Sequence, residues 1–266
     1  MKRLIYLSAF ILVIFSIQNL YSQVNVGQEN LAGNDSIKAT LQKAQLLTNQ
    51  GKTEEALKIY ISIIESEPDN RDAVQGWFIA TMRKTSSGPE GALKLIEDLG
   101  KLYPENNAIL FWKCFIEAST GLNEEALKDN EKLIKIYPDD PLNFILRGQV
   151  MHAKGEYTEA YQAFDRATTL DPSRWDVWGM KAGSLAKIGK FDEAITSINK
   201  GVELAPNEPL NIYNRACIYS LKGDKANALA DLQKAISINP SFKENAQKDE
   251  DFKSLYDNED FKKLTQ

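Results

Sequence analysis

Residues 155–172 read GEYTEAYQAFDRATTLDP, and residues 189–206 repeat the same plan as GKFDEAITSINKGVELAP. Both stretches begin with Gly, carry Glu-Ala four residues later and end on Pro. The closing Pro recurs at intervals of 36, 34, 34, 34 and 34 residues, at Pro68, Pro104, Pro138, Pro172, Pro206 and Pro240. An Ala stands twelve residues before each of them, at Ala56, Ala92, Ala126, Ala160, Ala194 and Ala228. Self-similarity at a fixed period of this size is typical of a repeat architecture.

Each unit predicts two helices. Within residues 142–154, apolar side chains recur with the spacing of one helical face, which predicts a helix there. Gly155 follows and suits the left-handed residue that ends many helices. A second helix is expected over residues 158–170, and it stops before Pro172 because the residue preceding a proline is disfavoured in the α region. The repeating unit is therefore a helical hairpin.

The residue types inside the hairpin predict how its helices pack. Gly148 and Ala160 are small enough to let the two helices approach closely, and Phe164 fills the space beside them. One hairpin cannot bury its apolar faces by itself, so neighbouring copies have to stack on it. The sequence thus favours an elongated array over a globular core.

The spacing of these residues resembles that of the tetratricopeptide repeat, a family of 34-residue helix–turn–helix units. The resemblance is carried by Trp178, Ala182, Gly189, Ala194 and Pro206 in one repeat and by Ala216, Tyr219, Gly223, Ala228, Ala235 and Pro240 in the next. Six repeats are expected, at residues 37–70, 71–106, 107–140, 141–174, 175–208 and 209–242. The resemblance implies an all-α, right-handed superhelical solenoid of about six helix–turn–helix units with a C-terminal capping segment.

The ends of the array and one of its repeats depart from this pattern. Residues 83–92, RKTSSGPEGA, replace the tight turn of repeat two, and Pro89 suits the first turn of the helix that follows. Residues 23–36 are expected to be a flexible leader, with Ser36 as the cap of the first helix. Residues 243–266 are expected to form a C-terminal cap, because a solenoid needs an end with a polar outer face.

The N-terminus has the pattern of a secretory signal peptide over residues 1–22. Lys2 and Arg3 precede a mostly apolar run over residues 4–17, and Ser22 is a small residue at the expected cleavage site. A run of 14 residues is shorter than the roughly 20 that span a bilayer as a helix, which favours cleavage over an uncleaved anchor. Export to the periplasm, with no membrane insertion after cleavage, is therefore expected; secretion or a retained anchor is the alternative.

Composition and charge exclude several classes of function. The chain is 43% hydrophobic and 26% charged, as folded proteins are, and its net charge is −5. Loss of Lys2 and Arg3 with the signal leaves 30 basic against 37 acidic residues, a net charge of −7. Such a balance gives no field to attract nucleic acid, so no nucleic-acid partner is expected.

The sequence also lacks the residues that most catalytic or metal sites need. His152 is the only histidine, and Cys114 and Cys217 are the only cysteines, interpreted as buried side chains that do not form a disulfide. Acidic pairs such as Glu54-Glu55, and the run over residues 249–251, are interpreted as charges at helix N-termini. No catalytic residue, cofactor or metal ion is therefore predicted, and the protein is expected not to be an enzyme.

What remains is a binding surface. The resemblance implies an inner wall made by the first helices, on which positions two, five, nine and twelve of each unit face inward. The candidate partner-binding groove on this stripe consists of Phe111, Phe115, Leu142, Ile145, Gln149, His152, Gly179, Gly183, Tyr213 and Cys217. Some family members bind C-terminal carboxylates through a Lys at a position that is Phe111, Ile145 or Tyr213 in this chain. A C-terminal carboxylate is therefore not expected as its ligand.

Two functions are consistent with this pattern. One is a non-catalytic scaffold outside the cytoplasm that holds a protein or peptide partner in the groove with apolar and aromatic side chains, because exposed apolar patches mark interaction sites. The small Gly179 and Gly183 are expected to leave a notch between bulky neighbours. The other is a self-associating structural component of an envelope assembly, in which repeat ends or the groove bind a second copy. The sequence leaves open whether the groove is empty or filled by the chain's own ends.

Overall fold

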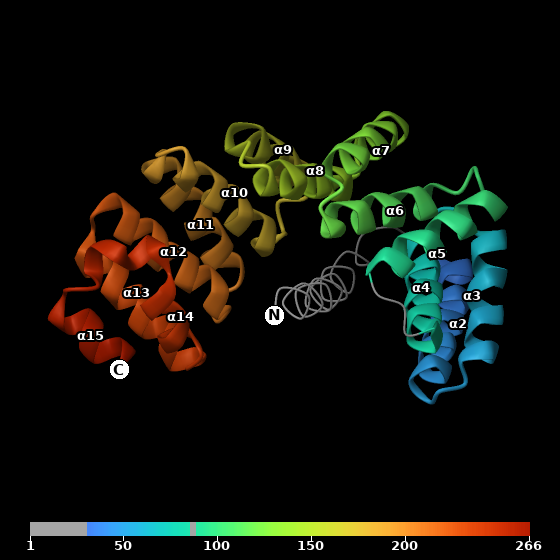
Figure 1. Ribbon diagram of the computed structural model, residues 1–266, viewed down its shortest axis with the longest axis horizontal. Helices are drawn as coiled ribbons and strands as arrows, with labels where there is room; N and C mark the ends of the chain where they lie inside the picture. The colour runs from blue at the N-terminus through green and yellow to red at the C-terminus, as the bar shows by residue number, and fades with distance from the viewer. Residues whose placement is uncertain (1–30, 86–88) are drawn as a thin grey trace. The chain divides into compact units, whose positions relative to one another are not determined.

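The computed structural model describes residues 31–85 and 89–266, and their regular secondary structure is entirely helical (Figure 1). Contacts divide the chain into two compact units, one ending at Leu133 and the other running from Ile134 to Gln266. Within the described ranges no helix is both long and apolar enough to cross a membrane. The predicted signal peptide at residues 1–22 lies outside the described residues.

The first three predicted repeats supply the helices of unit 1. These helices are α2 (Leu31–Asn49), α3 (Thr53–Ser66), α4 (Arg71–Thr85), α5 (Pro89–Leu102), α6 (Asn107–Thr120) and α7 (Asn123–Ile136). The last of these helices, α7, crosses the division between the units. Consecutive helices pair as α2 with α3 and α5 with α6, and α4 packs on both α3 and α6. The start of α5 at Pro89 confirms that this proline begins a helix rather than breaking one.

Unit 2 continues the same alternation and ends in short helices. Its helices are α8 (Pro141–Ala153), α9 (Tyr157–Leu170), α10 (Trp175–Lys187), α11 (Phe191–Leu204), α12 (Pro209–Lys222), α13 (Lys225–Ile238), α14 (Phe242–Lys248), the 3₁₀ helix η1 (Glu250–Leu255) and α15 (Glu259–Thr265). Each hairpin packs on the next through its second helix, as α9 does on α10 and α11 on α12. Within the described residues, each of the six predicted repeats contains two helices.

The turns inside the hairpins have the backbone conformation that the glycines predict. Gly51, Gly121, Gly155, Gly189 and Gly223 all have positive φ, between 75° and 88°. This left-handed region is accessible to Gly without the penalty that a Cβ would add. The regular glycine therefore ends the first helix of a repeat and reverses the chain into the second.

Close contact between the helices of a hairpin also follows the prediction. A methyl group added at Gly148 would lie 2.6 Å from a ring carbon of Phe164, so the ring of α9 rests directly on the backbone of α8. Phe164 and Ala160 are 1% and 0% exposed. The small residue and the aromatic residue thus form one complementary contact.

Ion pairs between the two helices of a hairpin add to this packing. Arg215 on α12 donates from Nε and Nη2 to both carboxylate oxygens of Asp231 on α13, at 2.7 and 2.8 Å. Lys113 and Asp129 form the equivalent pair at the same repeat positions in α6 and α7. Lys113 also pairs with Glu117, which is 2% exposed. Charged side chains therefore join the helices of repeats three and six.

The first helix begins earlier than the sequence predicts. Ser36 is not the cap of this helix but lies inside α2, and the carbonyl of Ser36 accepts a hydrogen bond from the Thr40 hydroxyl. The predicted leader over residues 23–36 therefore overlaps a helix that starts at Leu31, and its residues 23–30 lie outside the described residues. Gly, Asn, Asp and Ser have low intrinsic helix propensity, but propensity is a weak guide to a boundary where no proline interrupts the chain.

Candidate functional site

The ten candidate groove residues fall into both units. Phe111 and Phe115 lie on α6 of unit 1, whereas the other eight lie on α8, α10 and α12 of unit 2. The site is therefore described unit by unit, and the face formed by α8, α10 and α12 is named the first-helix face of unit 2. As a partner-binding set, the ten residues stay a prediction.

The two phenylalanines of unit 1 belong to a buried aromatic cluster. Phe111 and Phe115 are 4% and 5% exposed, and both meet Trp112 edge to face, with ring centroids 5.9 and 5.4 Å away. The guanidinium of Arg71 lies 4.2 Å from the centroid of the Phe111 ring. These contacts hold both aromatic side chains inside unit 1, so the rings contribute to its core and present little surface to a ligand.

In unit 2, the apolar members of the set are also covered. Leu142 and Ile145 on α8 are buried, at 6% and 3% exposure. Gly179 on α10 lies under Asn211, whose Oδ1 would be 2.6 Å from an added methyl group, and the Asn211 amide donates to the carbonyl of Trp175. The notch expected at Gly179 is therefore occupied by a side chain of α12.

Three of the candidate residues remain partly exposed and form the accessible strip of this face. They are Gln149 and His152 on α8 and Gly183 on α10. The Gln149 amide lies 3.9 Å from the sulfur of Met180, which places α8 and α10 side by side along this strip. A methyl group added at Gly183 would meet no atom within 4 Å, so the backbone of α10 is open to an approaching group here.

A hydrogen bond and partial burial determine the surroundings of the His152 ring. Its Nδ1 lies 3.0 Å from the Ser184 hydroxyl, which donates its own proton to the carbonyl of Met180 at 3.1 Å. This hydrogen bond joins the imidazole on α8 to Ser184 on α10. Burial, with the nearby charge of Lys187, lowers the pKa of His152 below its ordinary value. The lowered pKa favours the neutral ring near pH 7.

At α12 the face is covered by the chain's own C-terminal segment. The Tyr213 hydroxyl donates to Asp249 Oδ2 at 2.8 Å, and its ring stacks on Phe242 with centroids 4.5 Å apart. Phe252 meets the same ring edge to face at 5.6 Å. Tyr213 and Cys217 are consequently only 6% and 5% exposed. In repeat six, the predicted groove positions are filled by the chain itself.

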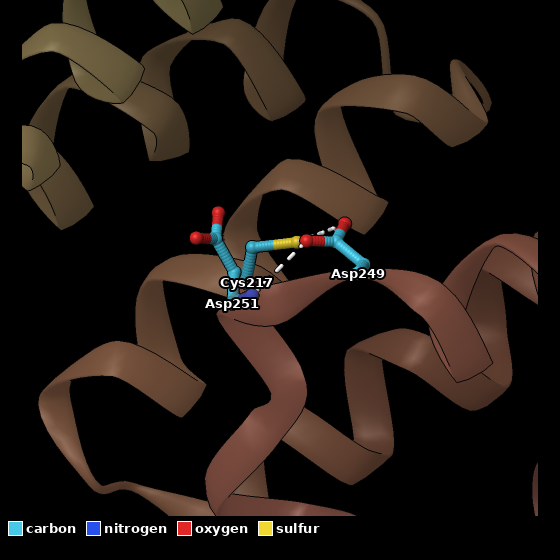
Figure 2. A group of neighbouring side chains, drawn as sticks. All are labelled: Cys217, Asp249 and Asp251. Carbon is cyan, nitrogen blue, oxygen red and sulfur yellow. Dashed lines mark hydrogen bonds between the residues drawn. The ribbon is translucent and has the colours of Figure 1, made fainter.

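Cys217, Asp249 and Asp251 could present three metal-ligand atoms within 4.8 Å of one another. Figure 2 shows the Cys217 and Asp249 side chains directed toward each other, with the Asp251 carboxylate on the other side of Cys217. The Cys217 Sγ lies 3.7 Å from Asp249 Oδ2. Asp249 already accepts from Tyr213 and from the amide of Asp251, and Asp251 pairs with Lys187 at 3.1 Å.

The thiol in this group is protonated and acts as a hydrogen-bond donor. Burial raises the pKa of Cys217 well above its ordinary value, and the neighbouring carboxylates raise it further. The protonated Sγ donates to Asp249 Oδ2 at 3.7 Å. The three residues are therefore a hydrogen-bonded junction between α12 and the C-terminal segment.

Two parts of this junction were not predicted as site residues. Lys187 lies one residue beyond the predicted stripe on α10, and the acids over residues 249–251 were interpreted as helix-capping charges. That interpretation is correct for Asp249, whose Oδ1 accepts from the amide of Asp251 at the start of η1. Its second role, as acceptor for Tyr213, depends on a contact between residues 36 positions apart, which no local pattern reveals.

Comparisons with known proteins agree with the repeated hairpins. Residues 38–70, 151–211 and 212–242 match family models described as tetratricopeptide repeat. Human tetratricopeptide repeat protein 13 is 26% identical over 130 residues, which are 47% of this chain and 15% of that protein. The human protein O-mannosyl-transferase TMTC3 is 24% identical over 192 residues, 67% of this chain and 21% of that protein. The chain thus spans less than a quarter of the length of either relative.

Among solved structures, the fold resembles that of YrrB, described as a TPR protein with an unusual peptide-binding site. The likeness has a TM-score of 0.53 at 20% identity and covers 71% of this chain and 97% of that one. Consecutive helix–turn–helix units, with glycine turns and a 34-residue period, define a helical-repeat protein. Over residues 38–70 and 151–242 the chain consists of tetratricopeptide repeats.

Proposed function

We propose that this protein is an exported, non-catalytic scaffold that binds a protein or peptide partner on the first-helix face of unit 2. The observation that carries the proposal is the accessible strip of Gln149, His152 and Gly183 on a face whose other candidate residues are buried or covered. The fold supports it, since YrrB shares the fold and is described as having a peptide-binding site.

The strip has the chemistry to bind an extended peptide. The open space beside Gly183 lets a ligand approach the helix closely, because no Cβ stands in the way. The amide of Gln149 can both donate and accept, and the neutral ring of His152 has one donor and one acceptor nitrogen. These groups complement the N–H and C=O groups of a peptide main chain. They sit on packed helices, which limits the ordering cost of binding.

Selection of peptides on the purified protein tests this site. Peptides from a displayed random library that bind the wild type are expected to lose about ten-fold or more in affinity for Gly183→Phe, because the new ring fills the open space. Gln162→Glu, at an exposed position on α9, is the matched control and should bind as the wild type does. Equal binding to all three proteins would refute the site.

Export rests on the N-terminal pattern of Lys2, Arg3 and the apolar run over residues 4–17. The expected result is that protein recovered outside the cytoplasm of an expressing bacterium begins at Gln23. N-terminal sequencing and cell fractionation measure this directly. A chain that keeps Met1 and stays in the cytoplasmic fraction contradicts export but leaves the peptide-binding site untouched.

A further inference from the structure

The segment over residues 249–255, named the strap, lies across the first-helix face of unit 2. Near its start, Asp249 accepts a hydrogen bond from Tyr213 on α12, and near its end, Ser254 lies 3.4 Å from Ser220 at the end of the same helix. Between them, Asp251 pairs with Lys187 on α10 at 3.1 Å. The strap therefore contacts two successive first helices.

The strap contributes apolar as well as acidic contacts. Phe252 and Leu255 are both 0% exposed, and the Phe252 ring meets the Tyr213 ring edge to face. Its side chains thus divide into acids that accept from Tyr213 and Lys187, and two apolar anchors that are fully buried. A peptide ligand held on a helical surface combines the same two kinds of contact.

The sequence of the strap occurs twice at the C-terminus. Residues 250–255 read EDFKSL and residues 259–264 read EDFKKL. Each copy follows a residue that caps its first amides: Asp249 accepts from Asp251 in the first copy, and Asn258 accepts from Asp260 and Phe261 in the second. The second copy forms α15, which packs on α13 and α14 instead of on the first-helix face.

The polar edge of the strap is accessible to a competitor. The side chains of Lys187 and Asp251 are 42% and 26% exposed, so water and other carboxylates reach this ion pair. Exposed pairs of this kind contribute little stability, which makes this edge the easiest part of the strap to release. Lys187 and the Tyr213 hydroxyl are both hydrogen-bond donors, so the surface beneath the strap selects acidic groups over basic ones.

We propose that α10 and α12 form a recognition surface for a peptide with an acid at its first and third positions, an aromatic residue at its fourth and an aliphatic residue at its seventh. Residues 249–255 satisfy this pattern and occupy the surface in cis until a partner segment of the same chemistry replaces them. This inference rests on the proposed peptide-binding function and extends it to the partner's chemistry. A tethered occupant acts at an effective concentration in the millimolar range, so a free peptide competes poorly until the strap is weakened.

Weakening the strap in the full chain tests the inference. The probe is a fluorescent synthetic peptide, KDEDFKSLYD, that copies residues 248–257. Its affinity, measured by fluorescence anisotropy, should rise at least about ten-fold when Asp251→Ala and Phe252→Ala vacate the surface, because the competing segment no longer occupies it. A peptide with Ala in place of its Phe should not bind the vacated protein.

The duplicated motif supplies the matched control. Asp260→Ala changes the residue of the second copy that corresponds to Asp251, which is exposed and pairs with Lys263 of the same helix, so the strap stays in place. It should bind the peptide no better than the wild type does. Equal affinities for the wild type and the vacated variant would overturn the proposal, as would equal gains from Asp251→Ala and Asp260→Ala.

Asp251→Ala alone keeps the test decisive if loss of Phe252 unfolds the cap. It removes only the partly exposed ion pair, so the peptide's affinity should rise about two- to five-fold. No rise in this variant refutes the competition. The library selection with the Gly183→Phe variant is a separate measurement. Failure of the strap proposal can therefore be distinguished from failure of the proposed peptide-binding function.

Discussion

Substitution of Gly148 by Ala tests the close contact that joins the helices of repeat four. The new methyl carbon would lie 2.6, 2.7 and 2.8 Å from three ring carbons of Phe164, where non-bonded carbons normally stand about 3.5–4.0 Å apart. Phe164 is 1% exposed, so its ring has no free space into which to move. Overpacking of this kind costs about 1–3 kcal/mol, against a gain of about 1 kcal/mol for Ala over Gly in a helix.

Gly183→Ala provides the reference, since it makes the same change in a helix where the methyl meets nothing within 4 Å. It should gain the helix-propensity term alone, so the difference between the two variants is the cost of overlap, about 1–3 kcal/mol. Melting followed by circular dichroism should place Gly148→Ala below Gly183→Ala by roughly 2–4 °C per kcal/mol. A Gly148→Ala midpoint at or above that of Gly183→Ala refutes the packing argument.

A double-mutant cycle shows whether Phe164 is the cause. Leu is shorter than Phe and leaves room above residue 148, so Gly148→Ala should cost less in a Phe164→Leu background than in the wild type. Residues in direct contact show such coupling, whereas independent sites add. An unchanged cost in the two backgrounds would assign the destabilisation to another neighbour of Gly148.

Two further predictions follow from buried ionisable groups. The thiols of Cys114 and Cys217 should resist a disulfide reagent in the native protein and react after denaturation, because burial raises the pKa of both; rapid native labelling contradicts this. Glu117→Gln should raise the melting temperature near pH 7, because burial raises the pKa of this carboxyl and one of its oxygens has no hydrogen-bond partner among the described residues. A carboxyl with a raised folded pKa favours the fold below its unfolded value of 4.5 and loses that contribution as pH rises through the folded pKa, so the advantage should vanish near pH 4. An advantage that is absent near pH 7, or the same at both values, refutes that role.

The hairpins were predictable because their determinants are local. The Gly155 turn and the contact between Gly148 and Phe164 both depend on residues within one repeat, and the structure confirms both. The early start of α2 was not predicted, because the weak helix propensities around Ser36 do not define a helix boundary without a proline or a capping residue.

The state of the groove positions could not be derived from the same pattern. A stripe of residues shows which side chains share a helical face, but their exposure depends on elements that pack against that face. Asn211 over Gly179 and Asp249 over Cys217 are contacts between residues that are 32 positions apart in sequence. The sequence therefore predicted which residues occupy the candidate positions, but it did not predict whether their side chains are exposed.

Position nine of the first helix illustrates how one backbone plan yields different surfaces. In three successive repeats of unit 2 it is Gln149, which is partly exposed, Gly183, which has open space beside it, and Cys217, which is covered by Asp249. The hairpins place these residues equivalently, so the differences arise from the side chains and from the C-terminal segment. The surface open to a ligand therefore spans α8 and α10 while the strap is docked. Release of the strap extends this open surface by one repeat to α12. A partner can then contact a larger area of the protein, and this is the physical reason why strap release and partner binding are coupled.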